Sequence, residues 1–500
     1  MTRRAGGRAL ICMLALLGAL TVATGRLAHF HSTSFAGPVV VRVDTAHPQA
    51  SIPPGAIGLS TETSELTDAH LSATHRWLVT LMRMLGPAVL RIGGDSVDDS
   101  WWTTDGEPAP AWASYTITPA DLTDLRGLLA STGWRTVLGV NLAHFEPARA
   151  AQEAAQARAL LGNRLLAIEV GNEPNGYSGE GAAHPVRPRG YGSSDYLAEF
   201  NSYAQAIEQS APGLPVVGPA VSGTRWLSQM GAGASAFAQI TDHYYYAGPG
   251  ATCALLAPHA TGTEPTVGEL LARGSREQQE QTLAALRAVA QSAGRGVAID
   301  ETGTGRCNGS SPSSATFASA LWALDFSLRA LASGVQQLNF HGRFGTCEPE
   351  NQTPLCAATP VLAARGEVTA RPEFYGLLAA SRLEGTRLLR CQLTAAAGER
   401  DLTAWAGITP RGTVKIALLD MATTGKPLHI RIPLRGYRSA RVLRLAAGSV
   451  FARDAVTLGG ASLSAARRWH PRAQPLRSSD GTFSLTIPSA SAAIVTASRT

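Results

Sequence analysis

Between residues 56 and 340 the chain repeats one pattern eight times: a short apolar run, a polar loop and then, in most repeats, a helical stretch. The runs have the length of buried strands. They are Ala56–Ser60, Ala88–Ile92, Thr136–Leu142, Leu166–Val170, Val216–Pro219, Gln239–Tyr244, Gly296–Asp300 and Gln336–Phe340. Eight strand–helix units close into a (β/α)8 barrel, whose functional residues gather at the C-terminal ends of the strands. The pattern therefore predicts an α/β fold of the TIM-barrel type.

Helical periodicity separates most of these runs. The predicted helices are His75–Leu85, Pro119–Ser131, Pro147–Leu161, Ser194–Ser210, Arg276–Ala293 and Ala315–Ser333, with a weaker one at Trp226–Met230.

Beyond Leu383 the pattern changes to short strand-like runs separated by Gly, Pro, Arg and Ser. They are Thr403–Ile408, Val414–Leu419, Leu428–Pro433, Ser439–Leu445, Thr482–Pro488 and Ala492–Ala497. This spacing predicts an antiparallel β-sandwich. The strand-like stretch Pro38–Asp44 precedes the barrel and could pair with the C-terminal sheet. We therefore expect a strand segment at 38–54, a catalytic barrel at 55–382 and a β-sandwich at 383–500.

The N-terminus has the composition of an export signal. Two arginines, Arg3 and Arg4, precede an apolar stretch from Ala9 to Ala23, and small residues follow. Residues 1–28 are therefore expected to be a cleaved signal peptide, or an uncleaved membrane anchor as the alternative. In an oxidising compartment Cys347 and Cys356 are the favoured disulfide pair, because they flank one short polar loop.

Composition excludes several classes of protein. Apolar residues make up 45% and charged residues 16% of the chain, as in a folded globular protein. The net charge of +6 comes mainly from arginines that look scattered, without a nucleic-acid-binding motif, so we expect no nucleic-acid partner. No Cys-x-x-Cys cluster is present, and we expect neither a metal nor a cofactor.

Two strand-like runs each deliver a glutamate at the C-terminal end. Ala167–Asn175 contains Glu173 in the motif Asn-Glu-Pro, and Gly296–Gly303 contains Glu301. Two carboxylates on one barrel face suit glycosidic-bond cleavage, where one protonates the leaving oxygen and the other attacks or activates water. The alternative is that Glu173 caps a helix and Glu301 pairs with an arginine.

Other polar side chains follow neighbouring strands. Glu62 and Asp95 could accept hydrogen bonds from sugar hydroxyls, and Asn172 could contact a 2-hydroxyl. Each has an ordinary alternative, since Glu62 could be a solvated loop residue and Asp95 part of a tight turn. The tyrosines that follow Asp242 could equally be wall packing.

Together these segments resemble glycoside hydrolase family 79, the heparanase and β-glucuronidase family, within the large clan of retaining (β/α)8-barrel glycosidases. The segments are Leu90–Ser96, Glu169–Asn175, Asp242–Tyr245, Glu301–Gly303, Asn308–Gly309, Thr316–Ala318 and Trp322–Asp325. The resemblance implies that Glu173 is the acid/base and Glu301 the nucleophile. It further implies sugar contacts from a set of residues that comprises Glu62, Asp95, Asn172, His243, Tyr245 and, through its amide, Gly309.

The chain departs from that family after the eighth strand. Phe344 stands where the family is expected to have a tyrosine that contacts the glucuronate carboxylate. His341 or Arg343 could bind that carboxylate instead. The expected function is a secreted retaining β-glycosidase acting on a uronic-acid-containing glycoside or glycan, as a β-glucuronidase. The alternatives are an arabinofuranosidase, xylosidase or endo-glycanase of the same clan, or an inactive carbohydrate-binding barrel.

Overall fold

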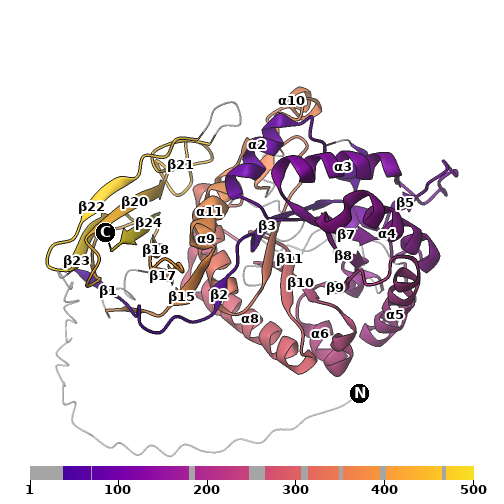
Figure 1. Ribbon diagram of the computed structural model, residues 1–500, viewed down its shortest axis with the longest axis horizontal. Helices are drawn as coiled ribbons and strands as arrows, with labels where there is room; N and C mark the ends of the chain where they lie inside the picture. The colour runs from indigo at the N-terminus through magenta and orange to yellow at the C-terminus, as the bar shows by residue number, and fades with distance from the viewer. Residues whose placement is uncertain are drawn as a thin grey trace, which may run out of the picture. The chain divides into compact units, whose positions relative to one another are not determined.

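A closed barrel of eight parallel strands forms the centre of the fold (Figure 1). The computed structural model describes residues 38–68, 70–178, 186–246, 265–305, 313–347, 353–394, 401–463 and 469–499. The barrel strands are β3 (Ile57–Glu62), β4 (Val89–Gly93), β7 (Arg135–Val140), β8 (Leu165–Val170), β9 (Val216–Ser222), β10 (Ile240–Tyr245), β11 (Val297–Gly303) and β12 (Gln337–His341). Pairing between β12 and β3 closes the barrel. All eight predicted runs are strands, and the (β/α)8 prediction is confirmed.

Helices surround the barrel strands. They are α2 (Arg76–Leu85), α3 (Pro119–Thr132), α4 (Pro147–Leu161), α5 (Ser193–Ser210), α6 (Arg225–Met230), α8 (Arg273–Ala293) and α9 (Phe317–Ala332), with short helices α1 (Ser64–Thr67), α7 (Val267–Leu271) and α10 (Pro360–Ala364). The helix α3 illustrates the local cause. Thr118 and Asp121 form a capping box at its start, and Gly133, in the left-handed conformation, ends it.

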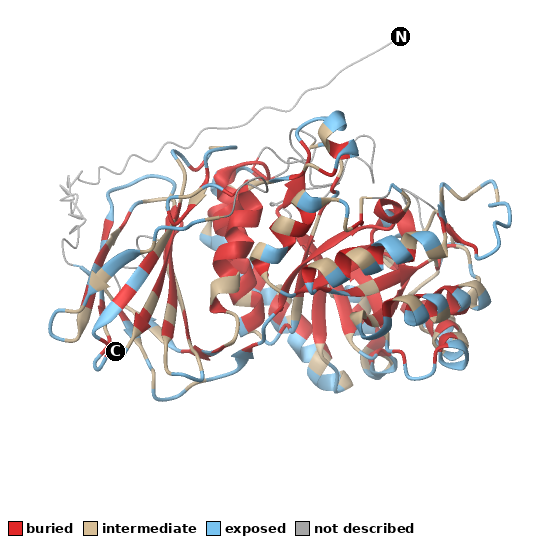
Figure 2. Ribbon diagram, turned by 45° about the horizontal axis from the view of Figure 1, so that its top comes forward, coloured by how far each residue is buried: buried red, intermediate tan, exposed pale blue. Residues whose placement is uncertain are grey.

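Four of the described helices were missed in the sequence, the short α1, α7 and α10 and the longer α11. α11 (Pro372–Ala380) is buried on every side, so its sequence lacks the amphipathic period that reveals a surface helix. It packs on α9, which is also buried along nearly its whole length. These two are the red helices between the barrel and the C-terminal strands in Figure 2.

The C-terminal region is a sandwich of two sheets, as predicted. One sheet has the order β16-β1-β19-β23, and the other has the order β2-β15-β17-β18-β24-β20-β21, with β22 paired to β20. The strands are β1 (Val39–Val43), β2 (Ser51–Ile52), β15 (Thr386–Leu389), β16 (Cys391–Leu393), β17 (Leu402–Ile408), β18 (Val414–Asp420), β19 (Leu428–Pro433), β20 (Ser439–Ala446), β21 (Thr457–Leu458), β22 (Gln474–Arg477), β23 (Thr482–Ile487) and β24 (Ser491–Ser498). Side chains from both sheets, such as Phe483 and Val495, share one core. Two further strand pairs lie outside the barrel and the sandwich, β5 (Ser100–Trp102) with β6 (Tyr115–Ile117) and β13 (Leu355–Cys356) with β14 (Thr369–Ala370).

The N-terminal strand β1 belongs to the C-terminal sandwich. Val41 pairs with Leu393 in antiparallel register, and Val39 pairs with Ile430 in parallel register. The next strand, β2, pairs with β15 at the edge of the other sheet. Residues 38–52 therefore supply two strands to sheets that are otherwise built from the last quarter of the chain.

Cys347 and Cys356 form a disulfide, as the loop between them suggested, and Cys391 is a free thiol. Cys253 and Cys307 lie outside the described residues, as does the expected signal peptide or anchor at 1–28. Among the described residues, no helix has the length and apolar content needed to span a membrane.

Candidate active site

Both candidate glutamates lie at the C-terminal end of the barrel. Glu173 follows β8 and has left-handed backbone angles, with φ 44° and ψ 50°. This conformation costs a non-glycine residue about 1–2 kcal/mol, and a hydrogen bond from the Glu173 amide to the Ala220 carbonyl (2.8 Å) helps to hold it. Pro174 then begins a single 3₁₀ turn, Pro174–Gly176. The carboxylate of Glu173 is therefore held at the end of a constrained turn.

A β-bulge in β11 brings two consecutive acids into the site. Asp242 pairs with Ile299, but His243 pairs with Glu301, so Asp300 is an extra residue in the ladder. Bulges re-aim side chains beside active sites. Here both Asp300 and Glu301 lie close to Arg91, at 3.8 and 2.7 Å.

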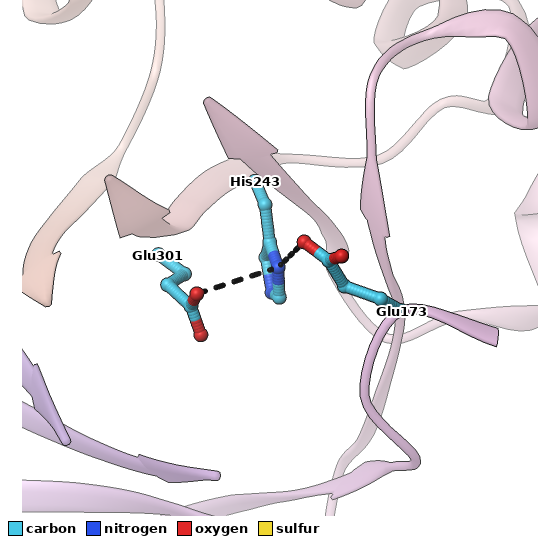
Figure 3. A group of neighbouring side chains, drawn as sticks. All are labelled: Glu173, His243 and Glu301. Carbon is cyan, nitrogen blue, oxygen red and sulfur yellow. Dashed lines mark hydrogen bonds and ion pairs between the residues drawn. The ribbon is translucent and has the colours of Figure 1, made fainter. Parts of the chain in front are cut away.

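His243 lies between the two candidate glutamates (Figure 3). Its Nδ1 is 2.9 Å from Oε1 of Glu173 and 3.9 Å from Oε1 of Glu301. One carboxylate oxygen of each glutamate lies within 4.8 Å of the other. Nε2 of His243 is 3.5 Å from Nη2 of Arg91, which can only donate. A neutral His243 therefore carries its proton on Nδ1 and donates it to Glu173.

Arg91 is the central cation of the site, and its side chain is fully buried. Its guanidinium donates to Glu169 (2.7 Å), Glu301 (2.7 Å) and the side-chain oxygen of Asn172 (2.9 Å). Gly93 leaves room for this group, since a Cβ there would lie 2.5 Å from Cζ of Arg91. Sequence reasoning did not assign Arg91 to the site. The available signal was an arginine inside an otherwise apolar strand, because buried charges occur only when they are paired.

Glu301 is surrounded by groups that favour its ionised form. Burial would raise its pKa, but the charges of His341, His243 and Arg91 and a hydrogen bond from Tyr245 hold the pKa far below its usual value. The Tyr245 hydroxyl lies 2.6 Å from Oε1 of Glu301. The side chain of Glu301 is 10% exposed, whereas that of Glu173 is 33% exposed. The two glutamates therefore differ in both charge environment and access to water.

Asp300 and Glu169 form a buried acid pair behind Glu301. Both oxygens of Asp300 lack a donor among the described residues. Burial and the negative charge of the neighbouring Glu169 raise the pKa of Asp300 well above its usual value. The pKa of Glu169 is lowered, because Arg91 outweighs the cost of its burial. The surroundings of Asp300 therefore favour its neutral form, whereas those of Glu169 favour its ionised form.

Glu62, at the end of β3, connects Ser96 and His341 beside the two candidate glutamates. It accepts hydrogen bonds from the amide (2.9 Å) and hydroxyl (2.6 Å) of Ser96. His341 Nε2 lies 3.4 Å from Glu62, and His341 Nδ1 lies 3.5 Å from Glu301. Burial would lower the pKa of His341, but these two carboxylates raise it. A Cβ on Gly94 would lie 2.5 Å from the Glu62 carboxylate, so this glycine permits the close approach.

Asn172 and Asp95 complete the group. The Asn172 amide donates to Asp95 (3.0 Å) while its oxygen accepts from Arg91. Partial desolvation and the negative charges of Glu62, Glu173 and Glu301 raise the pKa of Asp95, although solvent still reaches its side chain.

The structure thus gathers seven of the predicted residues around Arg91: Glu62, Asp95, Asn172, Glu173, His243, Tyr245 and Glu301. His341 joins them, while Arg343 is 57% exposed, with Nη2 3.9 Å from Glu62. Phe344 is buried. Gly309 lies outside the described residues. Glu173, His243 and Glu301 are also close enough to share a metal ion, but Nδ1 of His243 is already within hydrogen-bond distance of Glu173.

Comparison with known proteins identifies this architecture. No protein-family model and no curated protein sequence matches the chain. A solved 4-O-α-L-rhamnosyl-β-D-glucuronidase from Fusarium oxysporum 12S, in complex with Rha-GlcA, aligns with 91% of this chain and 100% of its own at 18% identity and a TM-score of 0.71. A GH51 arabinofuranosidase from Xanthomonas axonopodis pv. citri aligns with 92% and 100%, at 14% identity and a TM-score of 0.63.

A GH39 enzyme from Xanthomonas axonopodis pv. citri also aligns, over 94% of this chain and 99% of its own, at 16% identity and a TM-score of 0.60. The chain therefore has the fold of the barrel glycosidases that carry an additional β domain.

Proposed function

We propose that the protein is an exported retaining β-glycosidase that hydrolyses β-glucuronides. The observation that carries the proposal is the pair Glu173 and Glu301 at the C-terminal end of the barrel, with one carboxylate oxygen of each within 4.8 Å of the other. Carboxyl groups of retaining enzymes are about 5–5.5 Å apart, whereas inverting enzymes separate them by about 6.5–9.5 Å to admit water. The short separation supports double displacement.

The different surroundings of the two acids support the division of roles. Glu301 is ionised and attacks the anomeric carbon, while Glu173 gives its proton to the departing glycosidic oxygen. The glycosyl–oxygen bond breaks as the ester to Glu301 forms. A water then enters, Glu173 removes its proton, and attack on the anomeric carbon releases Glu301. Access of Glu173 to solvent suits this second step.

The cations around Glu301 stabilise it before attack and after release. Arg91 stays paired to Glu169 while Glu301 is esterified. The buried positive charge of Arg91 therefore keeps a carboxylate partner throughout the reaction. Asn172, held by both Arg91 and Asp95, is oriented to contact a sugar 2-hydroxyl. Such contacts strengthen in the transition state of glycoside cleavage.

Three observations favour a glucuronide. His341 and Arg343 place two cationic side chains beside Glu62 at the rim. The segments that contain Glu173 and His243 resemble family 79. The Fusarium protein with the same fold is a glucuronidase.

A neutral pentoside is the second candidate. His341 and Arg343 already face the carboxylate of Glu62, so neither is fully available for a substrate carboxylate. The similarity of the fold to that of a GH51 arabinofuranosidase also supports a pentoside substrate.

A panel of 4-nitrophenyl glycosides tests both candidates. We expect turnover of the β-D-glucuronide to exceed that of the β-D-glucoside, β-D-xyloside and α-L-arabinofuranoside. A clear preference for a pentoside replaces the glucuronidase proposal with the second candidate. Sugar binding without turnover of any substrate would reject the glycosidase proposal and favour an inactive binding barrel.

Export rests on the N-terminal sequence and is consistent with the Cys347–Cys356 disulfide. Mass spectrometry of protein recovered outside the cytoplasm tests it, because cleavage should remove about the first 24–28 residues.

A further inference from the structure

The charge of the chain is divided unevenly between its two parts. Residues 383–500 contain 17 Lys and Arg against 6 Asp and Glu, whereas residues 1–382 contain 26 against 31. The overall charge of +6 is therefore the sum of a net charge of +11 on the C-terminal region and −5 on the rest of the chain. Arginine is therefore about twice as frequent per residue in the C-terminal region, with 15 in 118 residues against 26 in the first 382.

Six of these arginines lie close together at one end of the sandwich, and we call them the arginine cluster. They are Arg411, Arg435, Arg438, Arg441, Arg477 and Arg499. Ser439, which follows Arg438, pairs with Arg477 across β20 and β22. The Arg438 amide donates to the Ser498 carbonyl, one residue before Arg499. Figure 1 marks the C-terminus beside β20, β22 and β24.

Three further contacts bring the segments around Arg411, Arg435 and Arg499 to the same end of the sandwich. Tyr437 donates its hydroxyl hydrogen bond to the Gly412 carbonyl (3.0 Å), next to Arg411. The Arg499 guanidinium lies 5.4 Å from the centre of the Tyr437 ring. The Leu434 amide donates to the Gly481 carbonyl (2.8 Å), which sets the turn that contains Arg435 against the turn before β23.

All six side chains of the cluster are exposed, and none forms an ion pair with a described carboxylate. Four acids are described between residues 401 and 499. Asp420 is buried, and Asp401 pairs with Arg276 of the barrel. That leaves Asp454 and Asp480 exposed. Six exposed positive charges at one end of the sandwich therefore have little compensation from the described carboxylates, an arrangement that attracts anions.

The guanidinium groups of the cluster make no hydrogen bond or ion pair to the described part of the sandwich. Arg444, also on β20, donates to Gln474 and to the Thr486 carbonyl, and Lys415 donates to the Arg382 carbonyl at the barrel. These two cations make structural hydrogen bonds, and the side chains of the cluster make none of this kind to residues that the structure describes. A solvated guanidinium presents its planar fork to carboxylate or sulfate groups.

We propose that the arginine cluster is a docking surface for an acidic polysaccharide that carries carboxylate or sulfate groups. The choice of a polysaccharide rests on the proposed glycosidase function, because such a surface would hold the polymer that the barrel cleaves. Tyr437, the aromatic residue beside Arg438, is buried. Its ring therefore offers no exposed platform of the kind on which single-stranded nucleic acids stack.

Binding to polygalacturonate tests the proposal, with neutral dextran as the uncharged comparison. The full chain carries Glu301→Gln so that binding is measured without cleavage. Arg438→Glu, Arg441→Glu and Arg477→Glu are combined in one variant. The matched control combines Arg126→Glu, Arg158→Glu and Arg225→Glu, three exposed barrel arginines, and changes the net charge equally.

We expect the cluster variant to bind polygalacturonate about tenfold or more weakly, and the control variant to bind nearly as the parent does. Raising the salt from 20 to 300 mM should weaken parental binding strongly, since the charges are exposed. Equal losses in both variants, or no binding by the parent, would overturn the proposal. Tighter parental binding to phosphatidylglycerol vesicles or single-stranded DNA, lost in the same cluster variant, would replace it with another partner.

Two measurements keep this result separate from the catalytic proposal. Thermal unfolding of both variants confirms that each is folded. In a chain that retains Glu301, the cluster variant should hydrolyse small aryl glycosides as fast as the parent. If the parent hydrolyses none, the glycosidase proposal fails, whereas polygalacturonate binding still reports on the cluster itself.

Discussion

Nη1 of Arg91 lies 2.7 Å from Oε2 of Glu301, and the same guanidinium also holds Glu169 and Asn172. One fully buried cation thus connects the candidate nucleophile, a structural acid and the residue next to the candidate acid/base.

Arg91→Met should therefore damage both folding and catalysis. It leaves Glu169 and Glu301 buried without their cation, and breaking a buried ion pair in this way costs about 3–5 kcal/mol. Arg91→Lys keeps the positive charge, but an ammonium group cannot make the same set of hydrogen bonds to Glu169, Glu301 and Asn172 as the planar guanidinium. The lysine variant should therefore still lose most activity. Thermal unfolding and kcat/KM are the measurements. Full activity of the lysine variant would show that charge alone is required.

Glu301→Gln should reduce kcat by about 10⁴-fold or more on every substrate, because no other group forms the glycosyl ester. Glu173→Ala should lose less with an activated aryl leaving group, which needs little protonation. Added azide should then restore turnover and yield a glycosyl azide with retained configuration. Identical losses in both variants, without an azide product, would contradict the assigned roles.

Asp300→Asn should stabilise the protein increasingly as the pH rises. The pKa of Asp300 is raised on folding, so the native state retains a proton that the unfolded chain releases near pH 4. Stability from that proton is present at low pH and is lost as the pH rises towards the native pKa. Asparagine mimics the protonated form without titrating. The difference in unfolding free energy should grow by up to about 1.4 kcal/mol per pH unit above about pH 4.

Thermal unfolding of Asp300→Asn and wild type between pH 4 and 8 measures this difference. Asp300→Ala is the control, since it leaves a cavity and should be less stable than the asparagine variant at every pH. A constant difference between Asp300→Asn and wild type would mean that Asp300 is ionised in the native state.

Arg343→Ala should lower kcat/KM on 4-nitrophenyl β-D-glucuronide by about ten- to hundredfold, because a charge-assisted hydrogen bond contributes about 1.5–3 kcal/mol. The matching β-D-glucoside should be nearly unaffected. Equal effects on both sugars would indicate that Arg343 acts through Glu62, its neighbour at 3.9 Å, and not through a substrate carboxylate.

The barrel was predictable because its strands are local apolar runs and its helices are amphipathic. Both signals are lost where burial is complete, and α11 was missed for that reason. Short strands such as β16 and β22 were missed because three or four residues carry too little periodicity to be recognised.

The site was predictable to the extent that its residues lie at strand ends. Glu173 and Glu301 follow from that placement alone. The role of Asp300 did not, because only the ladder register reveals the bulge that turns it towards Arg91. The arginine cluster was missed because residues between 411 and 499 meet through turns that a linear reading keeps apart.

The position of β1 has a consequence for synthesis of the protein. Its partner β16 leaves the ribosome about 350 residues later, which at about 5–20 residues per second is a delay of roughly 17–70 seconds. During that interval the sequence Val-Val-Val-Arg-Val has no strand to pair with and is exposed to other nascent chains. In a chain truncated before residue 383, β1 would never acquire its partner strands. Such a protein should therefore aggregate through β1.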